Sequence, residues 1–109
     1  MRNEDDVHRA VSSILNGIAP ERTARLTMRA RLVPDSNVCD FKFDALRLSG
    51  EVEWLDPDGG TLEKLMELVV ELRDWHVMTG VTGDRDPWVA CEFSLELETM
   101  RVSVGLSYE

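Results

Sequence analysis

The sequence predicts an α+β protein in which an antiparallel sheet of about five strands carries two helices on one face. Apolar residues recur every three or four positions in segments 3–17 and 61–79, and they alternate with polar residues in most of the remaining chain. The predicted order is helix, three strands, helix, two strands, with most connections too short for parallel crossovers. At 109 residues, one domain spanning 1–109 is expected.

Two segments have the apolar spacing of amphipathic helices. In the clearer one, residues 61–79, Thr61 is placed to cap the first turn and Gly80 to end the last. The other begins near Asn3 and ends near Gly17. Both are expected to pack on the same face of the sheet. The face of the longer helix that is predicted to be buried consists of Leu62, Leu65, Met66, Leu68, Val69, Leu72, Trp75 and His76.

Alternating patterns predict five strands, at residues 23–32, 39–44, 46–54, 89–98 and 101–108. The first has outward arginines and the second has outward Asp40 and Asp44. Pairing of these strands would neutralise the arginines within the sheet, and the alternative is a strip that binds a partner or an anion. In the third strand, Val52 and Trp54 are predicted to point inward, and Gly50 to leave room for a close neighbour.

Acidic residues dominate the second half of the chain. The formal net charge is -9, with fourteen acids against four basic residues in segment 51–109, whereas segment 21–50 has a small basic excess. An acidic surface repels nucleic acids and anionic membranes and attracts basic proteins. We therefore expect a basic protein partner, and neither nucleic acid nor membrane binding.

The residues that usually carry catalysis or bind metals are sparse in this sequence. His8 and His76 lie in predicted helices and are expected to be packed or surface histidines rather than bases or ligands. Cys39 and Cys91 lie in predicted strands without neighbours at metal-ligand spacing, so they are interpreted as buried apolar residues of a reducing compartment. We predict no enzyme activity, no metal and no cofactor.

A row of outward acids is the most distinctive candidate for a binding surface. It is predicted to be a solvated face, to be neutralised by nearby arginines, or to bind a basic protein. Trp88 falls on the outward phase of its strand, so either the register shifts near Pro87 or its ring is a contact anchor. Asp84 and Asp86 flank Arg85 in the preceding loop, where solvation explains them. The alternative is that the two aspartates bind a divalent cation or act as an acid/base pair. The predicted partner-binding residues are Glu51, Glu53, Asp84, Asp86, Trp88, Glu92, Glu96 and Glu98.

The order of elements and several aromatic positions resemble a known family. An N-terminal helix is followed by strands carrying FKFD and EVEW, a long helix ending in LRDWHVMTG, the segment PWVACEFSLELE and a last strand ending in Tyr108. Over nearly the whole chain, this layout resembles the YezG-like immunity proteins of bacterial polymorphic toxin systems. The resemblance implies a small non-catalytic protein that binds and blocks a cognate toxin domain, often a nuclease.

The leading hypothesis is therefore an immunity or inhibitor protein that acts by binding a toxin through an acidic surface. One alternative is a small-molecule-binding or enzymatic α+β domain with a pocket between the helices and the sheet. Another is a structural homo-oligomer. The sequence contains no apolar run of membrane-spanning length, and its N-terminus lacks the layout of a secretory signal, so a cytoplasmic location is expected.

Overall fold

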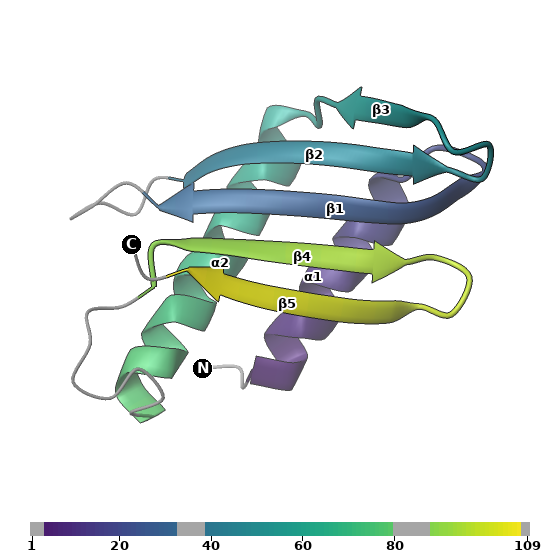
Figure 1. Ribbon diagram of the computed structural model, residues 1–109. Coiled ribbons are helices and arrows are strands. Elements are labelled where there is room, and N and C mark those ends of the chain that lie inside the picture. Colours follow the sequence, from purple (N-terminus) through teal and green to yellow (C-terminus); the bar gives the residue numbers. More distant parts are fainter. Residues whose placement is uncertain (1–3, 33–38, 80–87, 108–109) are drawn as a thin grey trace.

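The computed structural model describes residues 4–32, 39–79 and 88–107. Five strands form one antiparallel sheet in the order β3-β2-β1-β4-β5. Both helices cover the same face of this sheet and leave the other face open (Figure 1). The predicted α+β class and order of elements are confirmed. The elements are α1 (Glu4–Ile18), β1 (Thr23–Leu32), β2 (Cys39–Arg47), β3 (Val52–Leu55), α2 (Gly59–Thr79), β4 (Ala90–Glu96) and β5 (Arg101–Ser107).

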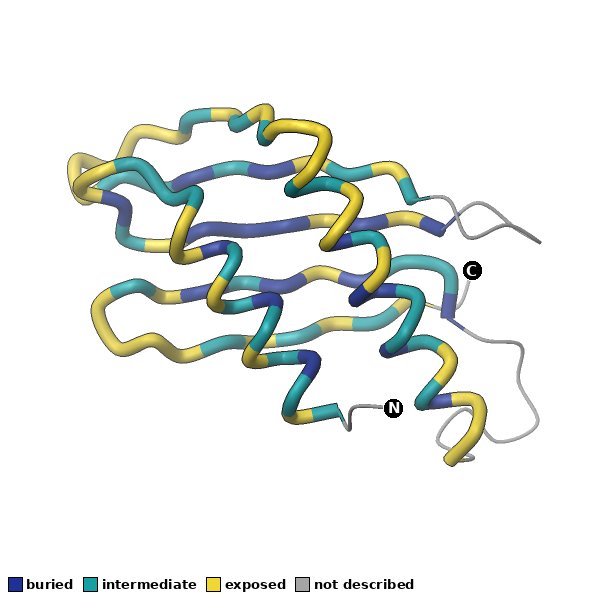
Figure 2. Tube along the Cα trace, turned by 180° about the vertical axis from the view of Figure 1, so that it is seen from behind, coloured by how far each residue is buried: buried dark blue, intermediate teal, exposed yellow. Residues whose placement is uncertain are grey.

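The core lies between the helices and the sheet. Alternate residues of β1, among them Leu26, Met28 and Ala30, point to the helices and are buried, as predicted from the alternation. In α1 the buried residues Val7, Val11 and Leu15 follow one another at four-residue spacing. Figure 2, which shows the molecule from the helical side, has buried segments in both helices and in the strands behind them. Burial of these apolar rows fixes which face of the sheet the helices cover.

The start of α2 differs from the sequence prediction. The helix begins at Gly59, and the carboxylate of Asp58 accepts a hydrogen bond from the backbone N–H of Thr61 at 2.7 Å. Asp58 is therefore the capping residue in place of Thr61, because its oxygen satisfies an N–H that the first helical turn leaves unpaired. This hydrogen bond holds the pKa of Asp58 below its usual value.

The predicted third strand, residues 46–54, is wrong. Its first residues complete β2, and a turn follows, in which the Gly50 N–H donates to the Arg47 carbonyl at 2.9 Å. Gly50 has a φ of 93°, a left-handed conformation that favours glycine, so it serves the turn and does not make room for a neighbour. The chain then returns as β3 beside β2. Val52 and Trp54 consequently lie opposite Leu46 and Asp44, on the open face of the sheet.

Candidate functional site

The open face of the sheet carries mixed charge. Side chains that lie opposite each other on neighbouring strands share a face, so the strand register identifies the residues of this face. Basic and acidic residues are interleaved there, which corrects the expectation of an acidic sheet face. Its charged residues are Arg25, Arg29, Arg31, Lys42 and Arg101 together with Asp40, Asp44, Glu92 and Glu96.

Arg29 connects three strands at the centre of this face. Its guanidinium forms an ion pair with Asp44 on β2, and its Nε lies 3.6 Å from a carboxylate oxygen of Glu92 on β4. The hydrogen bond to Asp44 raises the pKa of Arg29 above its ordinary value. Neutralisation of an outward arginine within the sheet is therefore confirmed for Arg29.

The acids predicted on the last two strands lie at this face or beside it. Glu92 is held near Arg29, whereas Glu96 lies opposite Arg25 on one side and Arg101 on the other. Glu98 is exposed in the turn between β4 and β5. Because arginines flank both β4 acids, this row does not form a continuous negative surface.

Glu51 and Glu53 lie at the other edge of the sheet. β3 is separated from β4 by β2 and β1, so these acids do not share a surface with Glu92. Glu51 is exposed before β3, but Glu53 lies opposite Ala45 on the helix side and forms an ion pair with Arg47 at 2.7 Å. The prediction that Glu53 lies on the open face is wrong, because β2 continues to Arg47 with Ala45 facing the helices, so the alternation assumed from Leu46 onward was inverted.

Trp88 is not an exposed contact anchor. Its side chain is 1% exposed, and its indole N–H donates to Nδ1 of His76 at 2.9 Å. The residue precedes β4, so the strand alternation does not govern its direction. Asp84 and Asp86, predicted to lie beside it, are outside the described residues.

His76 is buried as a neutral imidazole. Since Nδ1 accepts the Trp88 N–H, the ring proton resides on Nε2, which lies 2.8 Å from the Glu4 carboxylate. The side chain is 3% exposed and both ring nitrogens are engaged, so the prediction of a packed histidine is confirmed.

The cysteines also belong to the helix side of the sheet. Cys91 is buried opposite Ala30 and Cys39 is half-buried opposite Leu32, and both are free thiols. Burial raises the pKa of Cys91 to about 12 and that of Cys39 to about 11. Such thiols are poor nucleophiles at neutral pH. Among the described residues, no group of three or more potential metal ligands is found.

The most exposed apolar residues around the sheet gather at the β2–β3 hairpin. Leu48 is 69% exposed, Val52 56% and Trp54 66%. We call these three residues the apolar edge. The sequence interpretation missed them because it assigned Val52 and Trp54 to the inner face, although Ser49-Gly50 was an available turn signal.

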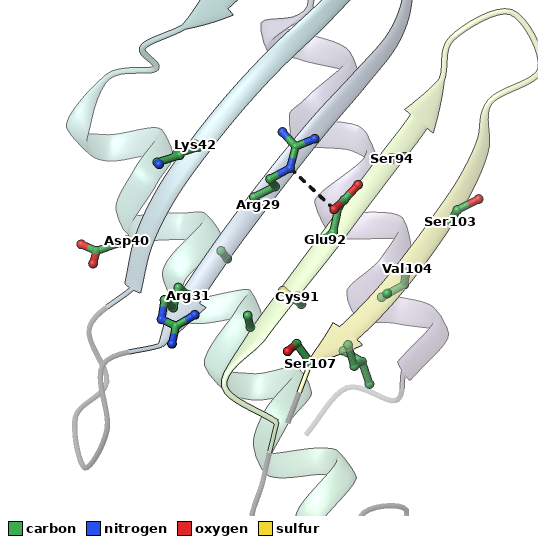
Figure 3. Close-up of a pocket in the computed structure, with 14 residues that line it drawn as sticks. Arg29, Arg31, Asp40, Lys42, Cys91, Glu92, Ser94, Ser103, Val104 and Ser107 are labelled. Carbon is green, nitrogen blue, oxygen red and sulfur yellow. Dashed lines mark ion pairs between the residues drawn. The ribbon is translucent and has the colours of Figure 1, made fainter. Parts of the chain in front are cut away.

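A second feature of the open face is a hollow of about 830 Å³ over β1, β4 and β5. Its lining includes the small residues Ala90, Gly105 and Ser107, which share the open face and which we call the floor. Arg29 and Arg31 also line the hollow (Figure 3). The hollow therefore lies on the face opposite to the helices. The sequence-based alternative placed a pocket between the helices and the sheet, where the structure has the apolar core.

Comparison of the sequence with protein-family models and with curated proteins finds no match. In the described part of the chain, neither helix combines the length and the apolar character needed to cross a membrane.

Proposed function

We propose that the protein is a non-catalytic inhibitor that binds a basic protein, such as a toxin domain, through the β3 side of its sheet. The observation that carries this proposal is the apolar edge, Leu48, Val52 and Trp54, exposed beside several carboxylates. Exposed apolar side chains that cluster on one edge favour a protein contact over a purely solvated surface.

Trp54 supplies the anchor in this proposal. Its large ring is two-thirds exposed and lies on the open face opposite Asp44. Tryptophan is enriched among the few residues that contribute most of the binding free energy at protein interfaces. Val52 lies on the same face of the same strand, so a partner that covers Trp54 also covers Val52.

The backbone of β3 provides a second means of contact. β3 is the outermost strand on its side of the sheet and pairs only with β2 among the described strands. Its outer backbone groups can therefore pair with an extended segment of another protein. An added strand would lie directly beside Trp54.

The charges near β3 favour a basic partner. Glu51, Asp56 and Asp58 are exposed just before and after the strand. Farther along the chain, α2 carries exposed Glu63 and Glu67 on its solvent side. Together with the net charge of -9, this distribution favours fast, electrostatically steered association with a basic surface. A nuclease toxin, whose substrate cleft is basic, has this property, and the resemblance to immunity proteins supports the same class.

Affinity capture from the native host tests the proposal. Immobilised wild-type protein is incubated with a lysate at low salt, and proteins bound to it are quantified by mass spectrometry against Trp54→Ala. A matched control is Met78→Ala, because Met78 is 65% exposed but lies at the end of α2. We expect one basic protein that is retained by the wild type and by Met78→Ala, and is depleted on Trp54→Ala.

The captured protein is then produced alone and assayed with and without the wild-type chain. A toxin-class partner is expected to lose its activity when the chain is added at equal concentration, and to keep it when Trp54→Ala is added. Capture of the same proteins by all three baits, or undiminished activity in the bound state, would contradict the proposal.

A further inference from the structure

We propose that the hollow over β1, β4 and β5 binds a compact ligand that joins an anionic group, carboxylate or phosphate, to a flat apolar body. This site goes beyond the proposed protein contact at β3, because β3 and β5 lie at opposite edges of the sheet. The proposal is based on the floor of the hollow, on the charge that faces it and on the net charge of the protein.

The floor exists because small residues occupy outward positions on adjacent strands. Ala90 on β4 lies opposite Ser107 on β5, and Gly105 lies opposite Glu92. A Cβ added at Gly105 would meet no atom within 4 Å, so the space above this position is open. The floor gives a flat body an apolar surface, with the Ser107 hydroxyl as a hydrogen-bonding group.

The charge that remains available in the hollow is positive. Glu92 is near Arg29. Asp40 also lines the hollow and lies opposite Arg31 in the register, but its carboxylate is turned away from Arg31 (Figure 3). Within the described residues, Arg31 forms no hydrogen bond or ion pair with a carboxylate. Its guanidinium therefore offers an anion the geometry that matches a carboxylate or phosphate.

A neighbouring pair of like charges strengthens this preference. Lys42 lies directly opposite Arg29 on the neighbouring strand, and the charge of Arg29 is already offset by Asp44 and Glu92. Lys42 points away from Arg29 (Figure 3). An anion bound in the hollow would therefore meet Lys42 as a second positive charge besides Arg31.

The remaining acidity of the protein limits the size of the ligand. A long polyanion such as a nucleic acid would be repelled by a chain of net charge -9, whereas a small anion meets mainly the local basic residues. The ligand class is accordingly a small organic acid or phosphate ester and not a nucleic acid.

Amide chemical shifts recorded during titration test this site. The probes are benzoate and phenyl phosphate, with benzyl alcohol as the uncharged body and inorganic phosphate as the anion alone. We expect saturable shifts of the Ala90, Gly105 and Ser107 amides, with a Kd of about 1 mM or lower for at least one of the two aromatic anions. Whichever of them binds more tightly identifies the anionic group, and the two controls are expected to bind at least tenfold more weakly.

Two variants and one matched control assign the binding to the hollow. Arg31→Gln removes the guanidinium that has no carboxylate partner among the described residues, and Gly105→Val fills the floor, so each is expected to raise the Kd about tenfold or more. Arg25→Gln removes the same charge from the same face of β1 but outside the lining, and is expected to change the Kd less than about twofold. Failure of both aromatic anions to saturate the shifts, equal binding of benzyl alcohol, or an unchanged Kd in Arg31→Gln would overturn the proposal.

Discussion

The indole N–H of Trp88 donates a hydrogen bond to Nδ1 of His76 at 2.9 Å, between two side chains that are almost completely buried. His76 in turn contacts the carboxylate of Glu4 through Nε2. This chain of contacts joins the segment just before β4, the last part of α2 and the first residue of α1. It therefore connects three segments that are far apart in sequence.

Replacing Trp88 with Phe is expected to destabilise the protein by about 1 to 3 kcal/mol. The substitution keeps an aromatic ring but removes the donor, which leaves His76 Nδ1 buried without its hydrogen bond. Urea denaturation measures the change in the free energy of unfolding. Trp54→Phe is the control. Because Trp54 is exposed, this substitution is expected to change the free energy of unfolding by less than about 0.5 kcal/mol. Equal stability of both variants would contradict the assigned role of the buried hydrogen bond.

His8 is expected to lower stability in acid. Burial lowers its pKa below 6.5, although nearby Glu4 and Asp5 oppose this shift, and its ring packs edge-on against Phe93. Below pH 6.5 the unfolded state therefore binds more protons at this residue than the folded state does, so the free energy of unfolding falls as the pH decreases. The stability that neutral His8 contributes is fully present above the pKa of this residue in the unfolded state. It is lost as the pH falls through the pKa of His8 in the folded state.

Two measurements check the His8 prediction. The ring is expected to titrate by NMR with a pKa below 6.5, and the stability lost between about pH 7.5 and about pH 5.5 is expected to be smaller in His8→Phe. The phenylalanine keeps aromatic packing but cannot be protonated. A titration above 6.5, or the same pH dependence in the variant, would show that His8 is not the responsible group.

The turn at Gly50 gives a prediction with a matched control. Gly50→Ala is expected to cost about 1 kcal/mol or more, because an L side chain is strained at a φ of 93°. Gly105→Ala, placed in β5 with open space around the added Cβ, is expected to be neutral or to stabilise by up to about 1 kcal/mol. Urea midpoints with an unchanged dependence on denaturant measure both effects. Equal losses in the two variants would argue against the assigned turn.

Both thiols are expected to react slowly in the folded protein. With pKa values of about 11 for Cys39 and about 12 for Cys91, the thiolate fraction near pH 8 is roughly 100-fold or more below that of an unfolded thiol. The rate of alkylation by iodoacetamide, followed by mass spectrometry with and without urea, checks this expectation. Similar rates in the two conditions would contradict the burial of these residues.

Strong periodicity made much of the fold predictable. The apolar alternation in β1 and the helical spacing in α2 each identified a buried face, since one face of each element must leave water. The β2–β3 hairpin was missed because its alternation continues through the turn. Leu46 and Trp54 keep the same phase on both sides of Gly50, so pattern alone resembled one long strand.

The candidate sites depended on information that periodicity does not carry. Trp88 precedes its strand and meets His76 only through tertiary packing. The hollow requires β4 to lie beside β1, which brings Ala90 next to Arg31, and the sequence did not indicate this strand order. The acidic row was correctly placed in part, but its neutralisation by arginines likewise depends on the register of three strands.

The affinity of the purified basic partner for the wild type and for Trp54→Ala tests the central proposal most directly. With Met78→Ala as the equally exposed control, titration calorimetry at low salt is expected to give an increase in Kd of about tenfold or more for Trp54→Ala only. Raising the salt concentration is expected to weaken all three complexes, because the partner is basic. Equal affinities of the three proteins would contradict binding through the β3 side of the sheet.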